Sequence, residues 1–130
     1  MVNFTRYQLP LFIWAILIYW ISSIETLPHV EIPIISPDKL AHVGVYFIFC
    51  WFSRRALYFQ VAVPFLKRWS FVGAFLLTCL YGYLDEVHQL YVPGRSYEYY
   101  DMLADAIGAL LFLAFFAISK RWQERRTSSG

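Results

Sequence analysis

An acid, an imidazole and a phenol follow one another at four-residue intervals near the start of one apolar segment. On a helix, Asp38, His42 and Tyr46 therefore share one face. Asp38 comes directly after Pro37, so it is equally a candidate for a simple first-turn acid that the helix dipole stabilises. His42 and Tyr46 lie deeper in the apolar run, where a polar side chain needs a partner. Such a face could move a proton or offer ligands to a cation.

A second polar group stands at the end of another apolar segment. Glu86 and Gln89 are three residues apart and share a helix face, whereas Asp85 points about 100° away from Glu86. For Asp85 and His88 we expect a solvated helix end. The carboxyl of Glu86 could serve as a general acid or base beside an imidazole.

The third polar group opens the last apolar segment. Asp101, Asp105 and Gly108 are spaced so that they lie along one stripe of a helix. Asp101 could be a first-turn acid, but Asp105 lies one turn deeper and should face other helices rather than lipid. Gly108 would let a neighbouring helix approach closely. The turn expected at residues 92–94 would direct Arg95 back over the helix ends.

Charge is out of balance where these groups would meet. Four carboxylates against two bases leave a formal charge of −2 with the imidazole neutral; the residues counted are Asp38, Glu86, Asp101, Asp105, Lys39 and Arg95. A half-buried site cannot hold that imbalance without cost. A carboxyl must be protonated, His42 must be charged, or a cation must bind. Each of these outcomes is typical of functional sites.

The composition indicates which solvent the supporting elements face. Of 130 residues, 59% are hydrophobic and 15% are charged, against about 45–50% and about 25% in soluble domains. A chain this short has too little interior to bury that much apolar surface, which excludes water as its main solvent. The low charge also excludes a disordered chain and a nucleic-acid-binding arm. Cys50 and Cys79 lie within apolar runs, which argues against a disulfide framework.

Four apolar stretches approach the roughly 20 residues that cross a hydrocarbon core. Because backbone groups in lipid must pair within their own segment, we expect these stretches to be helices. The sequence thus predicts an all-α membrane protein, a four-helix transmembrane bundle. Its spans are expected at residues 9–24, 40–58, 69–88 and 102–119, within one transmembrane domain of residues 1–119 that a basic cytoplasmic tail, 120–130, follows.

Basic residues set the expected orientation. Of the 11 Lys and Arg residues, all except Lys39 and Arg95 lie before the first span, from the end of span two to the start of span three, or after span four; Arg54 and Arg55 are in the last turns of span two. By the positive-inside rule, both termini and the middle loop face the cytoplasm. The loops after the first and third spans, and with them the three polar groups, then face outward.

Two segments, DKLAHVGVY and YGYLDEVHQLYVPGRSYEYYDMLADAIGALLF, resemble the VanZ-like family of small bacterial membrane proteins. The matching motif positions are Asp38, Lys39, His42, Asp85, Glu86, Gln89, Pro93, Gly94, Arg95, Ser96, Asp101, Asp105 and Gly108. Asp105 stands where the family commonly has Asn, which adds negative charge. The resemblance implies a multi-pass protein of the bacterial cytoplasmic (inner) membrane. It also implies an association with glycopeptide resistance, since the family is named for a teicoplanin-resistance protein, but it supplies no reaction.

These observations favour an outward-facing site that binds or acts on a cell-envelope component, such as a lipid-linked precursor or an anionic polymer. The residues expected to act as acids and bases are His42, Glu86 and Asp105. Those expected to contact the substrate are Asp38, Lys39, Tyr46, Gln89, Arg95, Ser96 and Asp101. Among these, Arg95 would clamp an anionic group. A divalent cation could bind at His42, Glu86 and Asp101, where it would attract a phosphate.

Two other roles stay open. The polar groups could form a structural lock that holds the helices in register or supports assembly. Proton or ion transport is the other role, although the polar residues stop in the outer halves of the spans. The sequence carries no serine or cysteine nucleophile signature, and binding and catalysis are both compatible with it. The expected partner is the lipid bilayer, and no nucleic acid is expected.

Overall fold

The computed structural model describes residues 4–25 and 37–128, and every element within these ranges is a helix. A π-helical turn, η1 (Phe4–Gln8), leads directly into α1 (Leu9–Ser22). The remaining helices are α2 (Pro37–Phe59), α3 (Pro64–Arg68), α4 (Ser70–Gln89) and α5 (Tyr99–Ser128). The outer loop expected after the first span lies mostly outside the described residues.

Proline and glycine mark several of the helix boundaries. Pro37 and Pro64 are the first residues of α2 and α3, the position where a missing N–H costs nothing. The turn expected at residues 92–94 is confirmed, and it separates α4 from α5. Gly94 has a φ of 78°, a left-handed conformation that favours glycine over residues with a Cβ.

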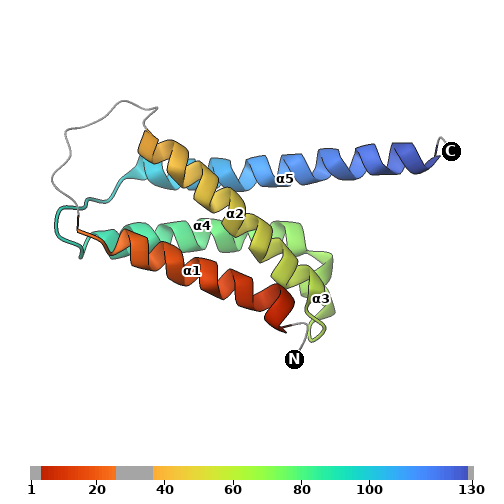
Figure 1. Ribbon diagram of the computed structural model, residues 1–130, viewed down its shortest axis with the longest axis horizontal. Coiled ribbons are helices and arrows are strands. Elements are labelled where there is room, and N and C mark those ends of the chain that lie inside the picture. The colour runs from red at the N-terminus through yellow and green to blue at the C-terminus, as the bar shows by residue number, and fades with distance from the viewer. Residues whose placement is uncertain (1–3, 26–36, 129–130) are drawn as a thin grey trace.

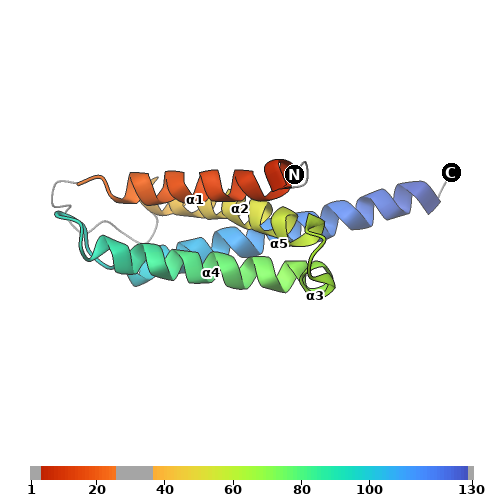
Figure 2. The same ribbon diagram turned by 90° about the horizontal axis from the view of Figure 1, so that it is seen from below.

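The central helix of the bundle is α2. It crosses α5 and α4, and it also contacts α1, η1 and α3 (Figure 1). α1 packs mainly on α2 and meets α4 at fewer points. The C-terminal part of α5 projects beyond the other helices, at the same end of the molecule as η1 and α3 (Figure 2). The opposite end holds the first turns of α2 and α5 and the last turn of α4.

Three of the described helices are long and apolar enough to cross a membrane. They occupy Phe4–Ser22, Ser70–Gln89 and Tyr99–Thr127. Large apolar side chains cover their outer surfaces, such as Ile16, Leu76 and Phe115, each at least 60% exposed. Because water would make such a surface costly, these faces suit contact with lipid. α2 is not among the three, since two charged residues near each end lower its mean hydropathy.

Each of the four expected spans overlaps a long helix, in the expected order and with shifted boundaries, but only three of these helices are apolar enough to count as candidate spans. α2 begins at Pro37, three residues before the expected start of the second span. α5 continues without a break to Ser128, so the predicted tail at residue 120 begins inside this helix rather than after it.

A glycine sets the distance between α2 and α5. A Cβ on Gly108 would meet the Val43 carbonyl oxygen and come within 3.0 Å of the Phe47 backbone nitrogen. The predicted close helix approach at Gly108 is therefore confirmed. Beside this contact, Cys50, Ala74, Ala109 and Phe112 form a buried core. Small residues let the α2 and α5 backbones touch, as is usual where helices pack in membranes.

We predict that Gly108→Ala lowers the free energy of unfolding by about 1–3 kcal/mol, the usual cost of overpacking. The added methyl group overlaps α2 backbone atoms, which cannot move aside as a side chain can. Thermal unfolding of the purified protein in detergent measures this effect. Gly44→Ala is the matched control, because a Cβ at Gly44 meets nothing within 4 Å. Equal melting temperatures for the two variants would contradict the close contact.

Candidate functional site

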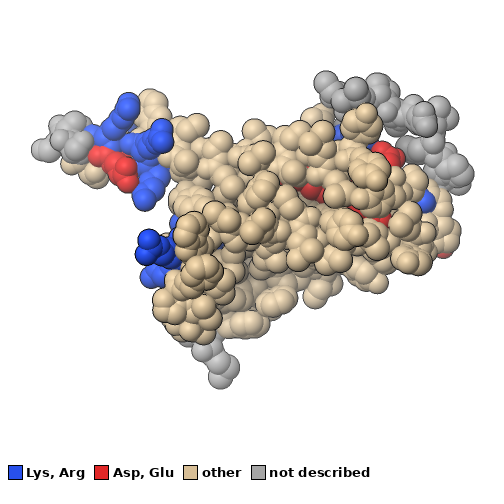
Figure 3. Space-filling view, turned by 180° about the vertical axis from the view of Figure 1, so that it is seen from behind, with Lys and Arg blue, Asp and Glu red and all other residues tan. Residues whose placement is uncertain are grey.

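Buried polar side chains gather where α2, α4 and α5 meet at one end of the bundle. The fractional exposures are 7% for Asp85, 0% for Glu86, 4% for Gln89, 4% for Asp101 and 1% for Asp105. In the space-filling view, most visible acidic atoms lie towards this end and the larger basic patches lie at the other (Figure 3). Carboxyl groups this deeply buried need partners, and those partners come from neighbouring helices.

Two basic side chains of α2 reach two acids of α5. His42 Nδ1 lies 2.9 Å from Asp105 Oδ1, and His42 Nε2 lies 3.9 Å from Asp101 Oδ2. Lys39 Nζ donates to Asp101 Oδ1 at 3.0 Å and to Glu98 Oε2 at 3.0 Å. Lys39 and His42 are one turn apart, and so are the two aspartates, so the four side chains join α2 to α5 in a single register.

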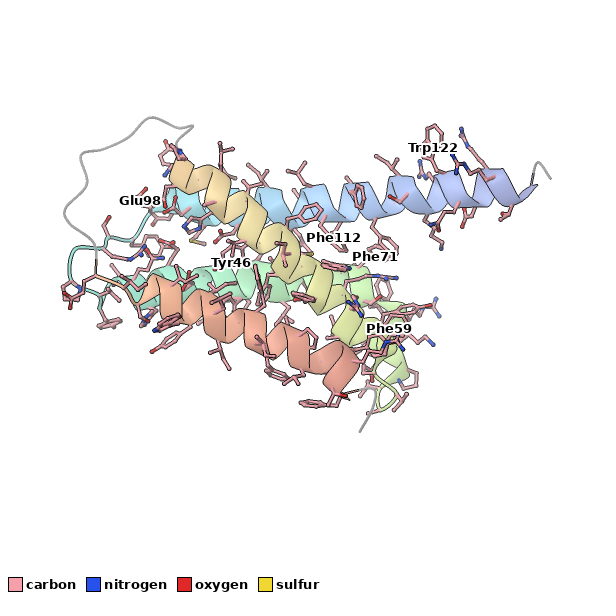
Figure 4. The ribbon with its side chains drawn as sticks, in the orientation of Figure 1. Tyr46, Phe59, Phe71, Glu98, Phe112 and Trp122 are labelled. Carbon is pink, nitrogen blue, oxygen red and sulfur yellow. The ribbon has the colours of Figure 1, made fainter. Side chains whose placement is uncertain are left out.

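Glu86 connects the end of α4 to the start of α5. Its Oε2 accepts a hydrogen bond of 2.9 Å from the backbone N–H of Glu98, which precedes α5 (Figure 4). Among the described residues, its Oε1 is buried without a hydrogen-bond partner, and the same holds for Asp105 Oδ2. Asp105 packs against α4 at Gly82, where a Cβ would come within 2.5 Å of Oδ2. We call Lys39, His42, Glu86, Asp101 and Asp105 the polar cluster.

The expectation of a solvated Asp85 is wrong. Its carboxylate is buried and accepts a hydrogen bond of 3.2 Å from the Tyr46 hydroxyl of α2. The spacing of polar and small residues along α4 is a sequence signal for this placement. Thr78, Gly82, Asp85 and Gln89 are spaced by four, three and four residues, and all four are buried. This stripe of small and polar residues is the face that α4 turns towards the bundle.

His88 is likewise half-buried instead of solvated. Its ring lies 4.5 Å from that of Tyr19, and its Nε2 lies 2.9 Å from Ser23 Oγ. The Ser23 hydroxyl donates to the Tyr19 carbonyl at 2.6 Å. A nucleophilic serine would have to donate its proton to the imidazole, so this arrangement does not activate Ser23. The contact instead joins the end of α1 to α4.

A pocket of about 170 Å³ lies beside the polar cluster, between α1, α2 and α4. One part of its wall is polar and is formed by Ser22, Asp38, His42, Tyr46, Asp85, Gln89 and Arg95. The other part is apolar and is formed by Trp14, Leu17, Ile18, Ile21, Ala41 and Val45. The predicted face of Asp38, His42 and Tyr46 thus lines this pocket.

Hydrogen bonds around the pocket hold α1 in place. Trp14 Nε1 donates to the Val45 carbonyl at 3.1 Å, and the Tyr81 hydroxyl donates to the Ala15 carbonyl at 2.5 Å.

Arg95 lies at the pocket rim but is partly engaged. Its Nε donates to the Ile24 carbonyl at 3.1 Å and its Nη2 to the Ile21 carbonyl at 3.3 Å. Ile21 is in the last turn of α1 and Ile24 follows its C-cap, so the guanidinium lies at the C-terminal end of this helix, where a cation is favourable. Arg95 therefore anchors α1, a role that the sequence does not predict, and has fewer donors for a ligand. Ser96, expected beside it, is exposed and does not contribute to the described pocket wall.

The candidate metal ligands only partly match the expected set. Asp38, His42 and Asp101 each offer one atom, and these atoms lie within 4.8 Å of one another. Within the described ranges, Glu86 is not part of this group. Carboxylate and imidazole together suit several divalent cations. Such a cation would compete with the Lys39 ammonium, which already lies 3.0 Å from Asp101 Oδ1.

The comparison with known proteins supports the family resemblance. A family model described as VanZ/LLP1 matches residues 4–120. No curated protein and no solved structure matched the chain. The matched range runs from η1 into the C-terminal part of α5, so it includes the pocket and the whole polar cluster. The chain belongs to the VanZ/LLP1 family.

Proposed function

We propose that this protein crosses the bacterial cytoplasmic membrane four times and binds the polar end of an amphiphilic cell-envelope component, such as a lipid-linked precursor, in the pocket. Both termini then lie in the cytoplasm, and the pocket opens near the outer surface. Residues 1–119 form the transmembrane domain, and the basic residues from 120 extend α5 into the cytoplasm. An association with glycopeptide resistance rests on the family resemblance alone.

The length and charge placement of α2 support a fourth span. Its 23 residues extend about 34 Å at 1.5 Å per residue, enough for a hydrocarbon core about 30 Å thick. Asp38 and Lys39 lie near one end, and Arg54 and Arg55 lie near the other. Because α2 is packed among α1, α4 and α5, it needs less apolar surface of its own than a lipid-facing helix.

The observation that carries the proposed function is the mixed wall of the pocket. Polar side chains, mostly of α2 and α4, and apolar side chains, mostly of α1, line the same space. An amphiphile has both kinds of surface, and in a membrane it would approach from the lipid side. The apolar wall would hold the start of its chain, while the polar wall would hold its head group.

The size of the pocket indicates how much of a ligand it holds. Sites that bury a whole drug-sized molecule have volumes of about 300–1,000 Å³, whereas this pocket has about 170 Å³. It therefore suits one sugar-sized group or a linking segment, with the remainder of the ligand in lipid or water.

The polar wall favours hydrogen-bond donors on the ligand. Asp38 and Asp85 present carboxylates, which accept hydrogen bonds when ionised. Hydroxyl or amine groups of a head group would supply the donors. The donors that remain on Arg95 could contact an anionic linkage, although two already donate to the carbonyls of Ile21 and Ile24. A hydroxyl-bearing group next to a phosphate fits both features.

If the site also catalyses a reaction, His42 is the residue placed to exchange a proton with the ligand. It lines the pocket, while its Nδ1 contacts Asp105 behind it. Asp105 and Glu86 do not contribute to the described pocket wall. Asp105 would act through the imidazole as a positioning residue, and Glu86 would fix the α4–α5 turn.

We predict that Ala41→Leu reduces binding of a polyprenyl-diphosphate-linked disaccharide at least about tenfold, because the added side chain fills pocket space and costs at least about 1.4 kcal/mol. Native mass spectrometry of the protein in mild detergent would measure the bound fraction. Ala41 lies on the pocket wall and is exposed, so the melting temperature should not change. Gly44→Leu on the same helix is the control, since its surroundings are open. Equal binding by both variants would rule out this pocket as the site.

A structural lock is the second candidate function, and the ion pairs between α2 and α5 favour it. The side chains of Lys39 and Asp101 are 12% and 6% exposed. Removing either one would leave the other as an unpaired buried charge, which destabilises the fold. If the lock is the only role, the polar cluster serves to stabilise the fold and the pocket needs no ligand.

We predict that Lys39 and Asp101 are coupled by about 0.5–3 kcal/mol in a double-mutant cycle with Lys39→Gln and Asp101→Asn. Chemical unfolding in detergent would provide the four free energies. The Lys120–Glu124 pair is the matched control: its atoms are 3.8 Å apart and its side chains are 66% and 65% exposed, so about 0–1 kcal/mol is expected. A coupling no larger than that of the control would exclude the lock. Lost stability with intact ligand binding would favour it over the pocket proposal.

A further inference from the structure

The end of the bundle opposite the polar cluster contains a caged arginine. The guanidinium carbon of Arg54 lies 4.6 Å from the ring centre of Tyr58, 4.8 Å from that of Phe71 and 4.1 Å from that of Phe116. The three rings come from α2, α4 and α5. Phe71 lies near the α3 end of α4, far from Glu98 at the polar cluster (Figure 4). A guanidinium contacted by three rings is held in a defined position.

This cation has no anionic partner in the described part of the chain. No carboxylate pairs with Arg54 in residues 4–25 and 37–128, and its Nε is buried without an acceptor. The acid on the neighbouring α5 extension, Glu124, contacts Lys120 instead. Aromatic rings attract the charge but do not accept all of the guanidinium's hydrogen bonds. The side chain is half-buried, so its remaining donors can reach a group at the surface.

A second cation shares one of these rings. Lys67 Nζ lies 5.3 Å from the Tyr58 ring centre, so Arg54 and Lys67 approach the same tyrosine. An anion bound beside this tyrosine would be attracted by both positive charges. Lys67 is exposed at the end of α3, which leaves room for an incoming group.

The surroundings are those of a membrane interface. Phe65 and Trp69 are 65% and 48% exposed beside the basic residues of α3. Exposed aromatic residues next to Lys and Arg are typical of the head-group region. Arg54 is 15 residues from Lys39 along α2, about 22 Å at 1.5 Å per residue, so the two ends are separated by most of a hydrocarbon core.

We propose that Arg54 and Lys67 bind the phosphate of an anionic phospholipid in the leaflet next to α3. The guanidinium edge would donate two parallel hydrogen bonds to the phosphate, and the ammonium would add a second charge. The acyl chains would lie on the apolar lipid-facing surface of the bundle. A lipid fits better than free phosphate because the aromatic cage is apolar and borders lipid. This site is independent of the pocket and of the proposed function.

Thermal unfolding in a neutral detergent tests the proposal. Phosphatidylglycerol should raise the melting temperature of the wild-type protein by several degrees, whereas phosphatidylcholine and inorganic phosphate at equal concentration should not. Arg54→Gln should lose most of this shift, and Arg54→Lys should also lose much of it, because an ammonium lacks the planar donor pair. Arg121→Gln removes the same charge from an exposed position on α5 and should keep the full shift.

Three results would overturn the proposal. In the first, phosphatidylglycerol raises the melting temperature of Arg54→Gln as much as that of the wild type. In the second, Arg121→Gln loses as much of this rise as Arg54→Gln does. In the third, inorganic phosphate stabilises the wild-type protein as well as the lipid does. The last result would indicate a site for free anions. If Arg54→Gln does not fold, Lys67→Gln decides, because Lys67 is exposed and should be replaceable without unfolding. Loss of about half the shift in Lys67→Gln supports the site, and a full shift excludes it.

Discussion

Charged side chains buried between apolar helices must find partners on another helix, and this constraint fixes how α2 meets α5. Lys39 and His42 pair with Asp101 and Asp105 in one register, just above the point where Gly108 brings the two backbones together. A shift of one residue along α5 would turn the acids by about 100° and separate all of these contacts. The close contact supplies packing energy, and the ion pairs select a single arrangement from those that packing alone allows.

The pocket follows from the same constraint, because α1 takes no part in the α2–α5 contact. α1 is held instead by hydrogen bonds in which the side chains of Trp14, Tyr81 and Arg95 donate to backbone carbonyls. These long side chains span a wider gap than the direct backbone contact between α2 and α5. Helices joined through long side chains leave space between their backbones, and here that space lies between α1, α2 and α4. The close α2–α5 contact and the pocket therefore lie next to each other.

The sequence was sufficient to predict the long helices, their order, the close approach at Gly108 and the meeting of three polar segments, because hydropathy and the 3.6-residue period depend on local residues. It did not predict the short helix α3 or the π-helical turn η1. It was not sufficient for Asp85, His88 and Arg95, whose partners lie on other helices. Spacing alone places Asp85 in solvent, because its neighbour Glu86 occupies an inward face. A helix packed on two sides has two inward faces, and Tyr46 of α2 occupies the second. Arg95 was expected to be free because the end of α1 could not be located from spacing.

His42 is the point at which binding and stability meet. Its ring faces the pocket, and its Nδ1 contacts Asp105, whose second oxygen has no partner among the described residues. When the imidazole is protonated, the two charges balance; when it is neutral, the buried carboxylate is left uncompensated in a medium of low dielectric constant. A ligand that places a donor or a positive charge beside His42 competes with that proton for the same carboxylates. Its binding would therefore be coupled to the α2–α5 contact. A purely structural lock gains nothing from exposing its imidazole to a pocket, and this favours ligand binding as the role of the site.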